Sequence, residues 1–359
     1  MKRLVACGLA IVSANLLMVS AVSADTLFSP LTNIQNMNNR ADASGVQRMG
    51  RGRLNVEAMQ KMFDQSSSRK SGVNQVPLHM LDGSQSTLHL RGQRLEGSGG
   101  IQVMSGLVDG QGHNLATLTN NNGVLMGRIW KDGKLFTING DTGGGYQLSE
   151  VKRSGIPRSK KALGPDDAPR QDNAHRANRQ EGEAPQPDEP IDLLVFISER
   201  AAEELGGRDE AMQHVNLLVA EANMIFRRSG AVDGQMFRLV KARINPLDED
   251  NDPVVNIKDW MTFKPFVADR NEVGADLVAF ISYPEDPKYC GTAFRGPEDY
   301  DPDGYPELGY SLAMFNCSRS GLDFVRGLGK NLGAGYERII EGERGHAYAL
   351  VNCSNSDLI

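Results

Sequence analysis

Histidine is scarce in this chain of 359 residues: there are six, and only His214 and His346 follow residue 190. Cysteine is scarcer still, with four residues whose spacing and neighbours do not fit a cysteine-rich zinc site. The chain also lacks a G-x-S-x-G elbow, a phosphate-binding P-loop and a Cys/His nucleophile pattern. These absences exclude the common signatures of serine and cysteine hydrolases, nucleotide-binding proteins and structural zinc modules.

Long apolar runs are also missing beyond the N-terminus, so no segment after residue 24 has the roughly 18 apolar residues of a membrane span. The first 24 residues contain Lys2 and Arg3, a largely apolar run over Leu4–Val19, and V-S-A before Asp25. This pattern predicts a secretory signal peptide that is cleaved after Ala24. We therefore expect a secreted or periplasmic protein without a membrane span.

The charge balance of the exported chain is mildly acidic. Loss of the two basic residues Lys2 and Arg3 with the signal peptide takes the formal net charge from −6 to −8. A protein of this charge is not expected to bind nucleic acid non-specifically. Three cysteines remain, Cys290, Cys317 and Cys353, and export favours one disulfide with one thiol left over.

Composition divides the exported chain into two domains, as its length of about 335 residues also suggests. We expect a β-rich domain over residues 25–151, with residues 25–74 poorly ordered apart from a candidate helix at Leu54–Phe63. Residues 152–190 carry six prolines, many charges and almost no apolar side chains, which is typical of a flexible linker. The basic run Arg158–Lys161 is interpreted as a solvated charge run, with a processing site as the alternative. The second domain spans residues 191–359.

Short alternating apolar segments begin at Gln75 and are separated by Gly and Asn. The pair Asp132-Gly133 lies between two of these segments and predicts a tight hairpin. The pattern indicates a small antiparallel β domain.

The second domain interleaves apolar strands with helical segments, which predicts a mixed α/β sheet. One long helix is expected within Asp209–Arg228, because its apolar residues recur on a single face. His214 lies beside this apolar face, and we expect it to be a half-exposed helix histidine. The residues of the face are Met212, Val215, Val219, Ala222 and Phe226.

The most informative segment is Phe324–Arg338, which reads F-V-R-G-L-G-K-N-L-G-A-G-Y-E-R. It has the frame of H-E-x-x-H-x-x-G-x-x-H, in which two His one helical turn apart bind zinc, a Glu acts as general base, and a Gly turns the chain toward a third His. The turn glycine is kept as Gly333. The ligand positions hold Arg326, Lys330 and Tyr336, and the base position holds Gly327. The segment resembles the zinc motif of the reprolysin-like (adamalysin-type) metzincin metallopeptidases in a degenerate form.

Other segments follow the order of elements in that family. Residues 310–317 stand where the family has its substrate-facing edge strand, and Ala349 stands at the methionine position of the Met-turn that ends in Cys353. Upstream, the strand, helix, strand and strand of the family resemble, in order, Ile191–Ser198, Asp209–Gly230, Met236–Ile244 and Gly274–Ser282.

The resemblance implies an α/β metzincin-like domain, with a mixed, mostly parallel sheet, an antiparallel edge strand and helices. The segment before it resembles the β-rich propeptide of bacterial reprolysin-like peptidases. The family pattern also implies a disulfide of Cys353 with either Cys290 or Cys317.

The altered motif does not suit zinc chemistry. Arg326 does not lose its proton in proteins, Lys330 would need a pKa shift of several units, and two cations one turn apart repel a divalent metal. Gly327 supplies no general base for water activation. A glycine within a helix also costs about 0.5–1 kcal/mol relative to alanine, which we interpret as loss of the helix geometry needed for catalysis. We therefore predict a catalytically inactive pseudopeptidase with no cofactor.

Binding of a peptide or protein partner is the function that remains. The edge strand would pair with an extended ligand through Tyr310, Leu312 and Met314. Arg326 and Lys330, together with Tyr336, would then bind an acidic side chain or a chain terminus. An active peptidase relative is a further candidate partner, and the competing interpretation is a closed cleft with both cations in solvent or paired with Glu337.

The alternative function is an active zinc endopeptidase whose metal site has moved. Its ligands would be His346, Glu341 and Glu343, and zinc would be a cofactor only in that case. A single histidine with scattered glutamates is more typical of a surface loop, so this alternative ranks second.

Overall fold

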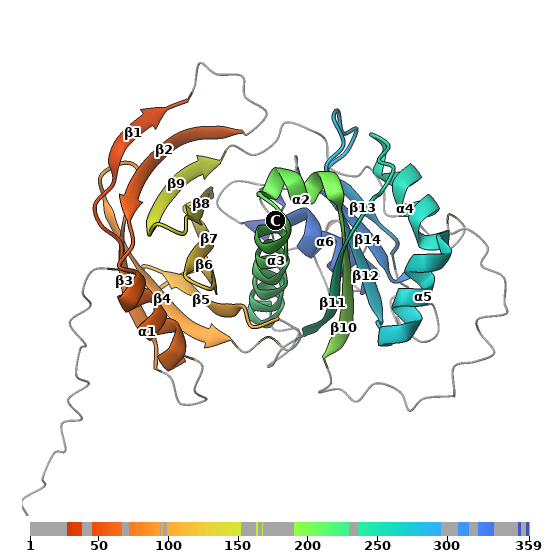
Figure 1. Ribbon diagram of the computed structural model, residues 1–359, viewed down its shortest axis with the longest axis horizontal. Coiled ribbons are helices and arrows are strands. Elements are labelled where there is room, and N and C mark those ends of the chain that lie inside the picture. The colour runs from red at the N-terminus through yellow and green to blue at the C-terminus, as the bar shows by residue number, and fades with distance from the viewer. Residues whose placement is uncertain are drawn as a thin grey trace, which may run out of the picture.

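The computed structural model describes residues 27–37, 45–66, 72–93, 95, 99–151, 163, 167, 190–229, 236–295, 308–315, 322–333, 351–352 and 357–358. These residues form one sheet of nine strands and one of five, together with a two-stranded pair, β15 (Val351–Asn352) and β16 (Asp357–Leu358). Helix α3 (Arg208–Arg228) lies between the two larger sheets (Figure 1).

The nine-stranded sheet is antiparallel at every pairing and has the order β1-β2-β9-β8-β7-β6-β5-β4-β3. It curls strongly, so that its two ends approach each other (Figure 1). Its strands are β1 (Thr32–Asn36), β2 (Val46–Arg53), β3 (Asn74–His79), β4 (Gln85–Gln93), β5 (Gln102–Val108), β6 (Gln111–Asn121), β7 (Val124–Lys131), β8 (Lys134–Gly140) and β9 (Gly145–Val151).

Tight turns connect the central strands of this sheet. The hairpin predicted at Asp132-Gly133 joins β7 to β8, with φ of 51° and 75° at the two residues. Asn122-Gly123 and Asp109-Gly110 form equivalent turns at the two preceding connections. Asn, Asp and Gly tolerate the positive φ that such two-residue turns require, which explains why these dipeptides stand there.

One face of the nine-stranded sheet encloses a hydrophobic core of its own. Strands β3 to β9 contribute to it, and helix α1 (Val56–Ser66) buries Met59 and Phe63 completely against it. Strand β2 pairs with β9 on one side and with the edge strand β1 on the other, which fixes this part of the chain at one end of the sheet. The segment 25–74, for which we expected poor order, therefore contributes two strands and a helix.

The five-stranded sheet has the order β11-β10-β12-β14-β13. Its strands are β10 (Ile191–Ser198), β11 (Phe237–Asn245), β12 (Leu277–Ser282), β13 (Gly291–Ala293) and β14 (Tyr310–Met314). The first four strands of this order are parallel, and β13 pairs antiparallel with β14. Helices α4 (Pro253–Thr262) and α5 (Lys264–Val273) cover the face that points away from α3 (Figure 1).

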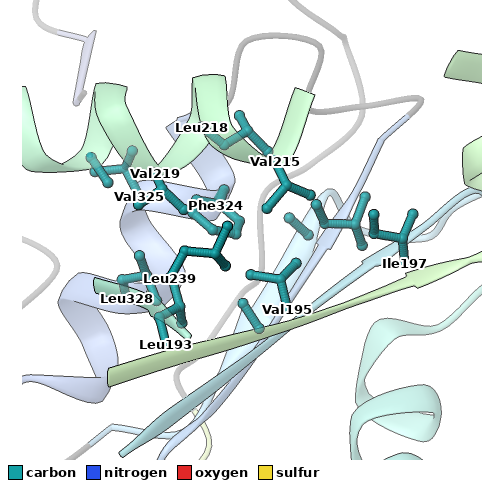
Figure 2. Close-up of a cluster of buried hydrophobic side chains, with 14 of the residues drawn as sticks. Leu193, Val195, Ile197, Val215, Leu218, Val219, Leu239, Phe324, Val325 and Leu328 are labelled. Carbon is teal, nitrogen blue, oxygen red and sulfur yellow. The ribbon is translucent and has the colours of Figure 1, made fainter. Parts of the chain in front are cut away.

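The opposite face of the smaller sheet packs against α3 and α6 (Leu322–Asn331), while the short α2 (Glu199–Leu205) leads into α3. Figure 2 shows this cluster, in which aliphatic side chains of β10 and β11 meet hydrophobic side chains of the two helices. The side chains are Leu193, Val195, Ile197, Leu239, Val215, Leu218, Val219, Phe324, Val325 and Leu328.

The predicted fold class is wrong. The largest part of the chain is the nine-stranded antiparallel sheet, so the protein is mainly antiparallel β and not an α/β domain preceded by a small β-rich segment. The segment 310–317 is not an edge strand either, because β14 pairs with β12 on one side and β13 on the other. Alternation of side chains within a strand says nothing about how many strands share a sheet, and this is why the sequence did not reveal the large one.

Helix α3 is buried on both sides, which overturns the half-exposed environment expected for His214. Strands β5, β6 and β7 of the nine-stranded sheet pack against the helix in addition to the strands of the smaller sheet. His214 is 7 % exposed, and its ring meets that of Phe315 edge-on at 5.2 Å between centroids. Gln213 donates hydrogen bonds from Nε2 to the carbonyl oxygens of Thr119 (3.0 Å) and Val124 (2.9 Å).

None of the helices that the structure describes combines the length and the apolar character needed to cross a membrane.

Candidate functional site

Helix α6 brings together three of the residues that the altered motif singled out. Its apolar residues face the five-stranded sheet, while Arg326 and Lys330 lie one turn apart on a less buried side. The guanidinium of Arg326 is 3.7 Å from the carboxylate of Asp323. Burial lowers the pKa of Lys330 to about 8, with Asp323 raising it and Arg326 lowering it further. This face of α6 is therefore cationic near neutral pH.

Gly327 lies where α6 approaches strand β14 closely. A Cβ atom at this position would be 2.8 Å from Cβ and 3.3 Å from Oγ of Ser311. The glycine thus serves the packing of the helix on the sheet, which corrects our interpretation that it reflects a loss of helix geometry. No glutamate side chain fits at this position unless β14 or α6 moves.

The end of α6 is fixed by the fully buried side chain of Asn331. Its Nδ2 group donates to the carbonyl oxygens of three residues around β13 and β14. These acceptors are Phe294 (2.9 Å), Leu308 (2.8 Å) and Tyr310 (2.8 Å). Beyond it, Gly333 has φ of 82° and its N–H donates to the carbonyl oxygen of Lys330 (2.9 Å), which closes the helix. The sequence motif predicted this turn glycine but not the role of Asn331.

The side chains of Tyr310, Leu312 and Met314 belong to the core on the α4 and α5 side of the smaller sheet. They are 2 %, 1 % and 0 % exposed, because β14 is an interior strand. The structure therefore does not bring them together with Arg326 and Lys330 at an open surface.

The remaining predicted site residues fall mostly outside the part of the chain that the structure describes. These are Tyr336, Glu341, Glu343, His346, Cys317 and Cys353. Cys290 is buried and disulfide-bonded, and its partner is not among the described residues. Within the described ranges, no group of three or more His, Cys, Asp or Glu side chains is placed to hold a metal ion. The relocated zinc site thus remains an untested alternative.

The actual edge of the smaller sheet on this side is β13, and a residue of the linker pairs with it. The N–H of Leu163 donates to the carbonyl oxygen of Ala293 (3.0 Å), and the N–H of Arg295 donates to the carbonyl oxygen of Leu163 (2.8 Å). Leu163 runs parallel to Phe294, and its side chain, 8 % exposed, joins the core around Phe294 and Trp260. The sequence marks this residue only in that Leu163 is the sole leucine of the charged linker, which does not indicate its partner.

A buried ion pair joins the nine-stranded sheet to α3. The side chains of Arg128 on β7 and Glu221 on α3 are 2 % and 1 % exposed, and Nε of Arg128 is 3.3 Å from Oε2 of Glu221. The indole Nε1 of Trp130 donates to the other carboxylate oxygen (2.7 Å). Burial lowers the pKa of Arg128 and raises that of Glu221, and their mutual attraction opposes both shifts. This pair could not be predicted from the sequence, because Arg128 and Glu221 are far apart in the chain and neither segment carries a pattern that indicates their contact.

No known protein family and no curated protein sequence matches this chain. Two solved structures resemble it weakly. One is described as the structure of a chaperone-substrate complex, with 12 % identity and a TM-score of 0.36, and the match covers 63 % of this chain but only 30 % of that one. The other is metalloproteinase-II from Bacteroides fragilis, with 10 % identity and a TM-score of 0.49 over 78 % of this chain and 86 % of that one. A metallopeptidase is thus among the weak structural neighbours, at a similarity too low to carry an argument.

Proposed function

We propose that this protein is an exported, catalytically inactive relative of the reprolysin-like metallopeptidases that acts by binding an extended segment of a peptide or protein partner. The pairing of Leu163 with the outer edge of β13 is the observation that carries the proposal. Leu163 makes main-chain hydrogen bonds along this edge and places its aliphatic side chain in the adjoining core. An extended ligand would bind through the same kinds of contact.

The linker competes with any partner for this edge. Leu163 belongs to the same chain as the edge that it pairs with, so this pairing is intramolecular and has an effective concentration on the order of millimolar. A partner therefore gains access only when the linker is displaced. Helix α6 packs against β13, so Arg326 and Lys330 lie on the neighbouring element and favour a ligand that carries a carboxylate.

The absence of catalysis is proposed from the residues of α6. Arg326 and Lys330 stand at the ligand positions of the motif, and neither suits zinc. Gly327 at the base position lies close to Ser311, so this position is needed for packing and has no room for the side chain of a general base.

Zinc content tests this part of the proposal. After dialysis without chelator, the exported protein from Asp25 to Ile359 is expected to hold well below one zinc per chain, as measured by elemental mass spectrometry. One tightly held zinc per chain would contradict the inactive reading and support the alternative site at His346, Glu341 and Glu343.

Peptide binding tests the β13 edge. We expect the Leu163→Asp variant of the full exported chain to bind a fluorescent peptide of residues 158–166 about tenfold more tightly than the wild-type chain, because its own linker no longer fills the edge. Fluorescence anisotropy measures both affinities. A peptide with Asp in place of Leu163 should not bind.

The matched protein control is Val255→Asp, an exposed apolar residue on α4. This variant should bind the peptide as weakly as the wild-type chain does. Equal affinity of the wild-type chain and Leu163→Asp, or no binding to either, would show that the edge is not a peptide site.

Lys330 gives the α6 site a pH dependence of known sign. Its pKa is about 8 in the folded chain and 10.5 as the ordinary value, so between these values the unfolded chain binds more protons. Stability that depends on this group therefore rises as the pH increases from about 8 to about 10.5. We expect the free energy of unfolding of the wild-type protein, measured with urea, to rise relative to that of Lys330→Met as the pH increases across this window.

The control is Lys264→Met, at an exposed lysine of α5, whose difference from the wild-type protein should not change with pH. If the difference between the wild-type protein and Lys330→Met changes with pH no more than this control does, the prediction is wrong.

A further inference from the structure

A cavity of about 320 Å³ lies between the nine-stranded sheet and α3. One wall is formed by residues of β2, β7, β8 and β9, and the other by residues of α2 and α3 together with Phe315 (Figure 1). Of the described residues, none from β13 or α6 lines the cavity, so it is separate from the peptide site proposed above. At about 30 Å³ per water, its volume corresponds to roughly ten water-sized groups, which suits one small organic molecule.

The ionisable side chains of the lining do not place a charge inside the cavity. The atoms Nη1 and Nη2 of Arg128 and Nε2 of His214 are enclosed by protein, and Arg128 forms its ion pair with Glu221 instead. Glu204 lines the cavity but is exposed to solvent. A charged ligand would thus be buried without a counter-charge, which is costly. The cavity therefore favours an uncharged ligand.

Four uncharged polar side chains form a continuous patch on the sheet wall. The register of β8 and β9 pairs Thr137 with Ser149 and Asn139 with Gln147, so these side chains lie on one face. Nε2 of Gln147 donates to Oγ of the buried Ser149 (3.0 Å), which orients the amide. Thr137 and Asn139 make no side-chain hydrogen bond to any residue that the structure describes. Hydroxyl and amide groups both donate and accept, so they complement the hydroxyl and amide groups of a ligand.

Apolar side chains flank this polar patch. The register pairs Met49 with Ser149 and Met126 with Asn139, which places a methionine on either side of the patch. Phe315 contributes to the opposite wall. Methionine side chains are flexible and polarizable, so they adapt to methyl groups and to the carbon face of a ring. A fitting ligand thus combines hydrogen-bonding groups with apolar carbon surface.

We propose that this cavity binds a neutral amino sugar of the N-acetylhexosamine class. The ring hydroxyls and the acetamido group bond to Thr137, Asn139 and Gln147, while the acetyl methyl group and the carbon face of the ring lie against Met49 and Met126. One sugar ring with one acetamido group suits the volume of the cavity.

Calorimetric titration of the wild-type protein with N-acetylglucosamine and with glucose tests the ligand class. We expect N-acetylglucosamine to bind at one saturable site and glucose to bind about tenfold more weakly, because glucose lacks both the amide and the methyl group. No saturable binding of N-acetylglucosamine, or equal affinity for the two sugars, would overturn the proposal.

An exposed residue of the polar patch locates the site without disturbing the core. Asn139→Leu should lower the affinity for N-acetylglucosamine at least about tenfold, because it removes an amide that bonds to the ligand. The matched control is Gln85→Leu, at an exposed amide residue of β4 outside the cavity, and it should bind as the wild-type protein does.

A variant that fills the cavity gives a second test. Val151→Phe, at a half-buried residue of the lining, should also lower the affinity at least about tenfold, since the added side-chain volume occupies the space of the ligand. The control is Val73→Phe, at a valine that is 42 % exposed and outside the cavity. Thermal unfolding identifies variants that do not fold. Unchanged affinity in folded Asn139→Leu or in folded Val151→Phe would contradict binding in this cavity.

Discussion

Replacing Glu221 by Ala is expected to lower the free energy of unfolding by about 3–5 kcal/mol. The variant would leave the guanidinium of Arg128 charged and 2 % exposed, with no carboxylate near it among the described residues. It would also remove the acceptor of the indole N–H of Trp130. An uncompensated charge in the contact between the nine-stranded sheet and α3 is the costliest single change that the structure suggests.

Urea unfolding of Glu221→Ala and of the double variant Arg128→Met/Glu221→Leu measures this effect. The double variant should recover much of the loss, because apolar side chains of similar size replace a buried ion pair at little cost. Glu203→Ala, at an exposed glutamate of α2, is the control and should change stability by no more than about 0.5 kcal/mol. A loss in Glu221→Ala no larger than in this control would show that the pair is not held as described.

Gly327→Ala is expected to destabilise the protein by about 1–3 kcal/mol, although alanine is the better helix former. In an unconstrained helix the same change stabilises by about 0.5–1 kcal/mol, so the sign itself is diagnostic. The opposite sign follows from the 2.8 Å that would separate the new Cβ from Cβ of Ser311.

A double-mutant cycle with Ser311→Gly tests this cause directly. The second substitution removes both atoms that the new methyl group would meet, so Gly327→Ala should cost little in the Ser311→Gly background. Chemical denaturation of the four proteins gives the coupling energy. If Gly327→Ala costs the same with and without Ser311, the close approach of α6 to β14 is not the reason for the glycine.

Local features of the fold could be predicted from the sequence where short-range chemistry decides them. The turn at Asp132-Gly133 follows from residues that accept positive φ, and the long helix around Val215 follows from its apolar periodicity. The sheet of nine strands could not be predicted in this way, because pairing of β2 with β9 joins residues about a hundred positions apart. The polar residues of α3 suggested contact with solvent, but groups of the nine-stranded sheet contact Gln213 and Glu221 instead. These partners are also distant in the sequence.

The candidate site divides in a similar manner. The motif frame placed Arg326, Gly327 and Lys330 on one helix, because their spacing is a local property of α6. It could not show which strand ends the sheet, so β14 was taken as the edge in place of β13. Leu163 was overlooked because an isolated leucine in a charged linker carries no periodicity, and its burial is decided by partners far along the chain.

The position of α3 between two sheets has a consequence for processing of the linker. A protease that cut the chain between Val151 and Ile191 would break a covalent connection, but the Arg128 and Glu221 contact and the hydrogen bonds of Gln213 would still join the two fragments. Separation would expose a helix that is buried on both faces, with charged and amide groups that have lost their partners. A nicked chain would therefore persist as a non-covalent heterodimer, in which the nine-stranded sheet of one fragment packs on helix α3 of the other.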